Sequence, residues 1–133
     1  MNKKTGFTLI ELMVVILILS ILFSVFLPRL VLMRYRSQVT ACTLYERNIA
    51  TALETYQNDY QPKYPSSLNL LYTNQYINAI PNCPSDSSPY QYNINGSSDY
   101  YTLWCQGTHY MVLVNTVNQG YPQYTPGRGI KLK

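Results

Sequence analysis

The first part of the chain is an unbroken apolar run. Residues 7–27, FTLIELMVVILILSILFSVFL, contain a single charged side chain, that of Glu11. As an α-helix this run would be about 31 Å long, which matches the hydrocarbon core of a bilayer. A secretory signal peptide has a shorter apolar core followed by small residues, whereas Pro28 and Arg29 follow here. The run therefore predicts a transmembrane helix that is retained.

Beyond Pro28 the pattern is that of a helix with one apolar face. Apolar side chains recur at three-, four- and seven-residue spacing, and this face comprises Val39, Cys42, Ile49, Leu53, Tyr56 and Tyr60. Pro62 then disfavours a helical conformation at Gln61. We expect one long helix that ends near Tyr60. Because Pro28 removes a backbone hydrogen bond, the helix should kink or open locally there.

The segment after the long helix predicts a small head. PKYPSSLNLL favours a short helix capped by Ser66 or Ser67. Strands are expected at residues 90–94, 100–105 and 108–115, with turns at Asn95-Gly96 and Gln106-Gly107. The predicted fold class is α+β, a long N-terminal helix packed on a small three-stranded antiparallel sheet. The Gly-, Pro- and Gln-rich end of the chain predicts a flexible tail.

Aromatic composition separates the two parts of the chain. All three phenylalanines lie within the first 26 residues, and all fourteen tyrosines lie at or beyond Tyr35. Phenylalanine suits hydrocarbon, whereas the tyrosine hydroxyl needs water or a hydrogen bond. The net charge is +4 and falls to +2 if Lys3 and Lys4 are removed, because eight basic residues then face six acidic ones. Such a mild balance argues against a dedicated nucleic-acid binder.

The N-terminus carries a specific motif. A short basic leader, MNKKTG, ends at Gly6, and FTLIE opens the apolar helix with Phe7 first and Glu11 fifth. This arrangement closely resembles the class III leader of bacterial type IV pilins and type II secretion pseudopilins. The resemblance implies that a prepilin peptidase cuts between Gly6 and Phe7 on the cytoplasmic face and methylates the Phe7 amine.

The resemblance also implies where the chain resides and what it meets. The precursor would cross the bacterial inner membrane once, with its head outside the cytoplasm. An inner-membrane assembly platform would then build this and other pilin-like subunits into a periplasmic or extracellular filament. The expected parts are a leader (1–6), a transmembrane and filament-core helix (7–28), an amphipathic helix (29–60), a head (61–117) and a flexible tail (118–133).

Glu11 most needs an explanation, because a carboxylate in a transmembrane helix is costly and usually marks a function. Pairing with the Phe7 amine of a neighbouring subunit would satisfy it and fix the axial stagger of the two helices. The resemblance assigns Glu11 this role, and it counts Pro28 among the assembly residues as a family helix-kinking position. Two other partners stay open, namely the amine of the same subunit and Lys4 of an uncleaved chain.

Three cysteines allow one disulfide and leave one thiol in an oxidising compartment. We predict a Cys83–Cys105 disulfide, with Cys42 free on the buried helix face or serving as an alternative partner. Together with His109 these cysteines could supply zinc ligands, but their spacing is irregular and export favours oxidation. We therefore predict no metal site and no cofactor, and we place His109 on a strand surface.

Signatures of catalysis are absent from the sequence. It contains no nucleophile elbow, no phosphate-binding glycine loop and no pair of carboxylates beside its single histidine. We therefore expect a structural subunit of a type IV pilus-like or type II secretion-like filament rather than an enzyme. The alternative is a monomeric membrane-anchored binding module that does not polymerise, although such an anchor gains nothing from a buried Glu11.

Overall fold

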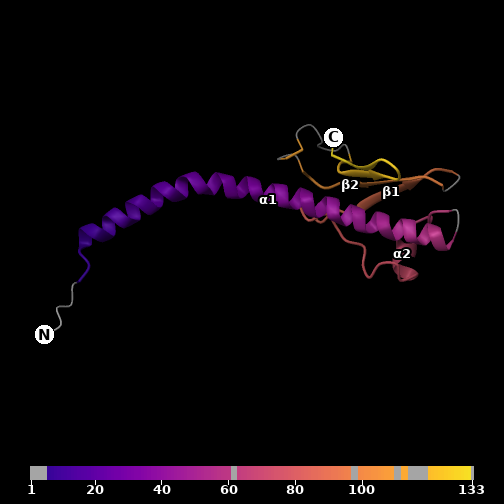
Figure 1. The fold of residues 1–133 in the computed structure, drawn as a ribbon, viewed down its shortest axis with the longest axis horizontal. Helices are drawn as coiled ribbons and strands as arrows, with labels where there is room; N and C mark the ends of the chain where they lie inside the picture. The colour runs from indigo at the N-terminus through magenta and orange to yellow at the C-terminus, as the bar shows by residue number, and fades with distance from the viewer. Residues whose placement is uncertain (1–5, 61–62, 97–98, 110–111, 114–119, 133) are drawn as a thin grey trace. The chain divides into compact units, whose positions relative to one another are not determined.

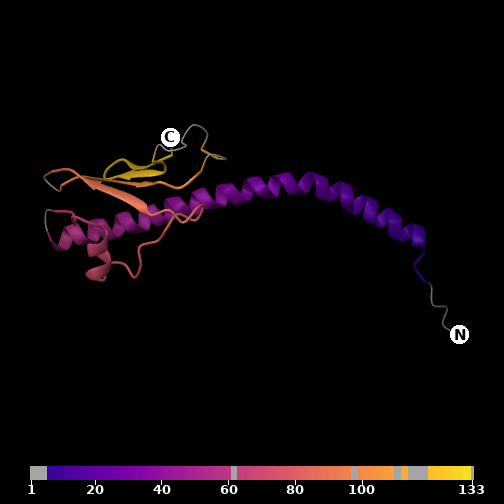
Figure 2. The same ribbon diagram turned by 180° about the vertical axis from the view of Figure 1, so that it is seen from behind.

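The computed structural model describes residues 6–60, 63–96, 99–109, 112–113 and 120–132. Two helices and four strands follow one another along the chain: α1 (Leu9–Asp59), α2 (Asn69–Thr73), β1 (Tyr90–Ile94), β2 (Tyr101–Cys105), β3 (Gln123–Thr125) and β4 (Gly129–Lys131). Figures 1 and 2 show these elements from opposite sides. The chain divides into two compact units, Met1–Arg34 and Tyr35–Lys133.

In the first unit, α1 carries apolar side chains all around. Every large hydrophobic side chain from Phe7 to Met33 is exposed, by 41% to 77%. In the described part of the chain, α1 is the one helix long and apolar enough to cross a membrane, judged by length and composition. The helix continues through Pro28, so its backbone does not open there. Most of the apolar surface of this segment therefore has no partner among the described residues.

In the second unit, α1 buries one face, as its sequence pattern predicts. That face consists of Val39, Cys42, Glu46, Ile49, Ala50, Ala52 and Leu53. The prediction is wrong at Tyr60, which lies just past the helix end and stays exposed. The Tyr60 ring stacks on that of Tyr56 instead, with 4.5 Å between their centroids. Glu46 is the unexpected member of the buried face.

The four strands form one antiparallel sheet in the order β1-β2-β3-β4. Tyr90 pairs with Cys105 and Ile94 with Tyr101, so the first two predicted strands and their turn are confirmed. Asn95 closes that turn, because its side-chain oxygen accepts hydrogen bonds from two backbone amides, those of Asp99 and Tyr100, each at 3.1 Å. The sheet has four strands rather than the three predicted.

The predicted third strand, residues 108–115, is wrong at its described positions. Thr108 and His109 belong to no strand, and the amides of Val112 and Leu113 donate to the His109 carbonyl at 3.0 and 2.9 Å. These bonds make a turn, so the chain does not continue as a hairpin after Gln106-Gly107. Residues 110–111 and 114–115 lie outside the described part.

The third place in the sheet is taken by β3, which comes from the segment predicted as a flexible tail. Leu103 of β2 pairs with Tyr124 of β3, and Tyr124 pairs with Ile130 of β4. The tail prediction is therefore wrong for residues 123–131, while residues 118–119 and 133 lie outside the described part. The chain after His109 returns to the sheet and completes it.

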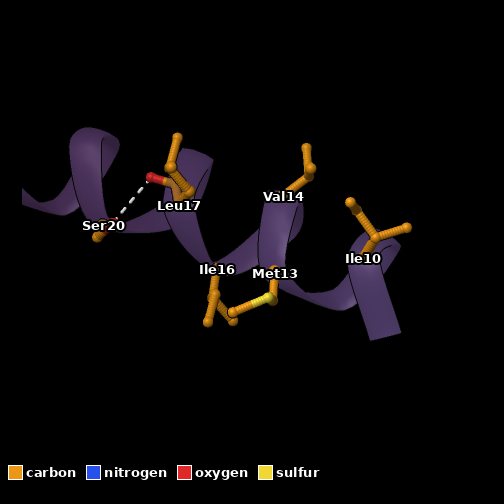
Figure 3. Close-up of a pocket in the computed structure, with 6 residues that line it drawn as sticks. All are labelled: Ile10, Met13, Val14, Ile16, Leu17 and Ser20. Carbon is orange, nitrogen blue, oxygen red and sulfur yellow. Dashed lines mark hydrogen bonds between the residues drawn. The ribbon is translucent and has the colours of Figure 1, made fainter. Parts of the chain in front are cut away.

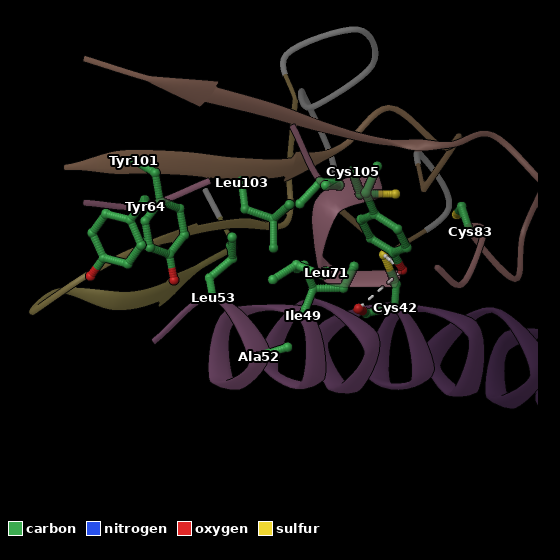
Figure 4. Close-up of a cluster of buried hydrophobic side chains, with 12 residues drawn as sticks. Cys42, Ile49, Ala52, Leu53, Tyr64, Leu71, Cys83, Tyr101, Leu103 and Cys105 are labelled. Carbon is green, nitrogen blue, oxygen red and sulfur yellow. Dashed lines mark hydrogen bonds between the residues drawn. The ribbon is translucent and has the colours of Figure 1, made fainter. Parts of the chain in front are cut away.

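The core of the second unit lies between α1 and the sheet, as Figure 4 shows. It contains Cys42, Ile49, Ala52, Leu53, Tyr64, Leu68, Leu71, Cys83, Tyr90, Tyr101, Leu103 and Cys105. Helix α2 confirms the predicted short helix and contributes Leu71. Its N-cap is Leu68, and the hydroxyl of Ser67 accepts a hydrogen bond from the Asn69 amide at 3.3 Å.

Candidate functional site

Thr8 and Glu11 form a reciprocal cap at the start of α1. The Thr8 amide and hydroxyl donate hydrogen bonds to Glu11 Oε2 at 2.9 and 2.8 Å. In return, the Glu11 amide donates one to Thr8 Oγ1 at 3.3 Å. This is a capping box, in which Thr precedes the helix and Glu three residues later satisfies its free amide. The Thr-x-x-Glu spacing is the signature of such a box in a sequence, although Thr8 was not among the predicted functional residues.

The predicted processing point lies just before this cap. Gly6 and Phe7 are exposed and belong to no helix or strand. The structure thus places Gly6, Phe7 and Glu11 together at the N-terminal end of α1, while Pro28 lies inside the helix. Both Thr8 bonds end on Oε2, so Glu11 Oε1 is not used by the cap.

The helix surface beyond the cap is apolar and open. Figure 3 shows a shallow depression on this surface, lined by Ile10, Met13, Val14, Ile16, Leu17 and Ser20. The Ser20 hydroxyl donates to the Leu17 carbonyl at 2.8 Å, and the Ser24 hydroxyl donates to Ile21 at 2.7 Å. Because both hydroxyls are satisfied within the helix, they do not make the surface hydrophilic. Such a surface suits lipid or another apolar helix rather than a small-molecule ligand.

A second group of side chains lies in the head. The ligand atoms of Cys42, Cys83, Cys105 and His109 all lie within 4.8 Å of one another, and all four residues are buried. His109 Nε2 is 3.5 Å from the sulfurs of both Cys83 and Cys105. Figure 4 shows the three cysteines gathered at one end of the core. We call these four residues the Cys3His cluster.

Three separate parts of the fold build the Cys3His cluster. Cys42 comes from α1, Cys83 from the loop before β1, and Cys105 from the end of β2. His109 follows in the turn that replaces the predicted third strand. All three cysteines are free in the structure, and the Cys83–Cys105 disulfide stays a prediction. The prediction that His109 is a surface strand residue is wrong, since its side chain is 6% exposed.

Each sulfur of the Cys3His cluster has a polar neighbour besides the cluster itself. The Tyr90 hydroxyl donates to Cys42 Sγ at 3.2 Å, and the Gly107 amide donates to Cys105 Sγ at 3.2 Å. Ser85 Oγ and Cys83 Sγ are in hydrogen-bond contact at 3.0 Å. Hydrogen bonds from Cys105 and Cys42 lower the pKa of the Cys83 thiol, whereas hydrogen bonds with Cys105 and Cys83 raise the pKa of the Cys42 thiol.

Glu46 is buried one helical turn after Cys42. Neither of its carboxylate oxygens has a hydrogen-bond partner among the described residues. Desolvation raises the pKa of this carboxyl to about 8. The Cys105 amide acts in the opposite direction and lowers this pKa by less than desolvation raises it. The sequence could have indicated that Glu46 is buried, because helical spacing places position 46 on the predicted apolar face of the long helix.

Comparison with known proteins agrees with the N-terminal geometry. Residues 1–27 match the family model of the prokaryotic N-terminal methylation motif. Over 59 residues, 44% of its length, the chain is 42% identical to the type IV wide pilus major component PilA4 of Thermus thermophilus. The chain spans 45%, about half, of the length of that relative. No solved structure matches the chain significantly. The methylation motif thus stands at the head of the apolar helix, and the chain is similar to a type IV pilin over less than half of its length.

Proposed function

We propose that the chain is a structural subunit of a pilus-type filament and polymerises through the first half of α1. One observation carries the proposal. The first half of α1, which is apolar all around, has a single acid, Glu11, in its first turn. Lipid can cover that surface in the precursor, and the helices of sister subunits can cover it in a filament. The acid distinguishes the subunit from a plain anchor.

Processing supplies the charge that the acid needs. The exposed, non-helical Gly6-Phe7 bond is open to a prepilin peptidase at the cytoplasmic face of the inner membrane. Cleavage there leaves an amine on Phe7, and methylation keeps that amine positively charged. The mature subunit would then join other pilin-like subunits on an inner-membrane assembly platform, with its head outside the cytoplasm.

The capping box does not compete with pairing between subunits. Thr8 occupies Glu11 Oε2, which leaves Oε1 to accept a charge-assisted hydrogen bond from the Phe7 amine of a neighbour. In a filament core without water, an unpaired carboxylate is expensive. The arrangement that satisfies Glu11 therefore has one axial stagger, while apolar contacts provide most of the attraction.

The test is crosslinking of the full chain in membranes that contain the prepilin peptidase and the assembly platform. We expect a ladder of oligomers for the unchanged chain. Glu11→Gln should lose the ladder, because glutamine can still cap the helix but carries no charge. Thr8→Ala is the matched control, since it removes the hydroxyl from the cap and keeps the charge, and it should retain the ladder.

Two outcomes would contradict the proposal. A ladder that persists in both Glu11→Gln and Glu11→Ala would show that the charge pair is dispensable. A mature N-terminus at Met1, read by mass spectrometry, would remove the amine that the pairing needs. Absence of any ladder for the unchanged chain would instead favour a monomeric, membrane-anchored binding module.

A further inference from the structure

We propose that the Cys3His cluster, Cys42, Cys83, Cys105 and His109, is a structural zinc site. Three thiolates and one imidazole form a ligand set that is common for zinc in closed, four-coordinate sites. All four residues are buried, and their ligand atoms converge within 4.8 Å. This inference does not rest on how the subunit polymerises, because the cluster lies in the head.

Two of the ligand–ligand distances agree with a tetrahedral ion. Zinc–sulfur bonds of about 2.3 Å and a zinc–nitrogen bond of about 2.0 Å, at tetrahedral angles, separate sulfur from nitrogen by about 3.5 Å. His109 Nε2 lies at 3.5 Å from Cys83 Sγ and at 3.5 Å from Cys105 Sγ. The ring nitrogen therefore already occupies the corner that a tetrahedron requires relative to two of the sulfurs.

The surroundings of the sulfurs suit thiolates bound to a metal. Zinc ligands are oriented by an outer layer of hydrogen bonds. Here the Tyr90 hydroxyl donates a hydrogen bond to Cys42 Sγ, and the Gly107 amide donates one to Cys105 Sγ. Ser85 Oγ is in hydrogen-bond contact with Cys83 Sγ. A Cys83–Cys105 disulfide would make no use of Cys42, of its Tyr90 partner or of the inward position of His109. A four-ligand site uses all of them.

The two ligand-bearing loops are tied to each other directly. The Asp86 carboxylate accepts hydrogen bonds from the Thr108 amide at 2.9 Å and from the Thr108 hydroxyl at 3.2 Å. It also accepts one from the Ser88 amide at 3.0 Å. Gly107 lets the loops approach, because a Cβ on it would lie 2.2 Å from Cys83 Sγ. The loops are thus held at the separation the cluster needs without help from an ion.

Binding requires no oxidant. One Zn²⁺ accepts four lone pairs, thiol protons leave to solvent as the three sulfurs become thiolates, and no electron is transferred. The resulting centre carries one net negative charge, counted over the ion and its ligands. It would join α1, the loop before β1 and the end of β2 at one point. In a head with a small core, such a crosslink would stabilise the fold in the way that a disulfide often does.

The test begins with the metal content of the full chain, purified in detergent without chelators and under exclusion of air. We expect about one zinc ion per chain. Replacing zinc by Co²⁺ should give the intense visible absorption of tetrahedral cobalt and a sulfur-to-cobalt charge-transfer band. Removing zinc with a chelator should lower the melting temperature of the head, and adding Zn²⁺ back should restore it.

Substitutions in the Cys3His cluster distinguish a zinc site from a disulfide. Cys42→Ser and His109→Ala should each lose the bound metal and the cobalt spectrum. His109→Cys should keep them, because it restores a fourth ligand. Gln106→Ala, an exposed change in the same loop, is the matched control and should keep its zinc.

Three results would overturn the proposal. The first is a metal-free chain whose mass is lower by two hydrogens, which would show a disulfide. The second is a metal-free chain with three free thiols that takes up neither Zn²⁺ nor Co²⁺. The third is full zinc content in Cys42→Ser, which would place the metal elsewhere. Each of them leaves the crosslinking ladder of the N-terminal helix untouched, so the two proposals fail separately.

Discussion

The Tyr124 hydroxyl donates a 2.9 Å hydrogen bond to Glu54 Oε1, 70 positions earlier in the chain. The ring of Tyr124 also stacks on Tyr101, with 6.1 Å between centroids, and Tyr101 is fully buried in the core. These contacts connect β3 to both α1 and β2. The C-terminal hairpin is therefore part of the head.

Tyr124→Ala should destabilise the head by about 2 kcal/mol, because it removes a half-buried aromatic side chain from the sheet and its bond to α1. Tyr124→Phe should lose only the hydroxyl contribution, about 0.5 kcal/mol. Urea denaturation followed by the fluorescence of the single tryptophan, Trp104, would measure both. Tyr72→Ala changes a tyrosine that is 59% exposed and serves as the control. Equal midpoints for Tyr124→Ala and Tyr72→Ala would contradict the assignment of β3 to the head.

The hairpin was missed because its strands are short. Gln123–Thr125 and Gly129–Lys131 have three residues each, and none of them is fully buried. Alternation of apolar and polar residues cannot be recognised over three positions. By contrast, the long helix and the strands of the first hairpin follow patterns of five residues or more, and these were predicted correctly. The turn between β3 and β4 does carry a signal, since Gly127 and Gly129 adopt positive φ angles of 74° and 72°.

The Cys3His cluster shows a second limit on what can be predicted from the sequence. Its residue types are visible in the sequence, but Cys42 comes from a helix that only the tertiary fold brings to Cys83 and Cys105. Metal-site recognition by spacing works when ligands come in local pairs, and here one pair, Cys105 and His109, is local. The mistaken third strand also placed His109 on a surface. The irregular spacing of the four residues and this error in local structure together kept the cluster from being predicted.

Gly107→Ala should destabilise the head by about 1–3 kcal/mol, the usual effect of overpacking a filled site. Its new Cβ would lie 2.2 Å from Cys83 Sγ and 3.0 Å from Asp86 Oδ1, so the two loops must separate. Gly96→Ala is the matched control, because nothing lies within 4 Å of the added carbon. Urea midpoints of the two variants would measure the difference, and a Gly107→Ala midpoint equal to that of Gly96→Ala would show that the loops separate freely.

Tyr90→Phe should lower the stability of the head by about 1 kcal/mol, because a buried hydroxyl and its bonds are lost. That hydroxyl lies 3.2 Å from both the carbonyl oxygen and the sulfur of Cys42. Without it, Cys42 should also react more slowly with an alkylating reagent in the metal-free chain, because the hydrogen bond from the Tyr90 hydroxyl lowers the pKa of the Cys42 thiol and the thiolate is the reactive form. Tyr100→Phe, at an exposed tyrosine, should change neither the midpoint nor the alkylation rate. Unchanged Cys42 reactivity would indicate that the hydroxyl bonds chiefly to the carbonyl.

Thr8→Ala should loosen the start of α1, because the Glu11 carboxylate then loses the hydroxyl donor of the capping box. The Thr8 amide would remain, but without the hydroxyl the reciprocal bond to the Glu11 amide cannot form. Amide hydrogen exchange of the full chain in detergent should therefore become faster at residues 9–12, and Thr8→Ser should restore the slow exchange. If exchange is equally slow in all three chains, the surrounding apolar medium alone holds the first turn, and the capping box is incidental. Since Oε1 takes no part in the cap, faster exchange in Thr8→Ala together with a preserved oligomer ladder would separate the two uses of the same carboxylate, one for each oxygen.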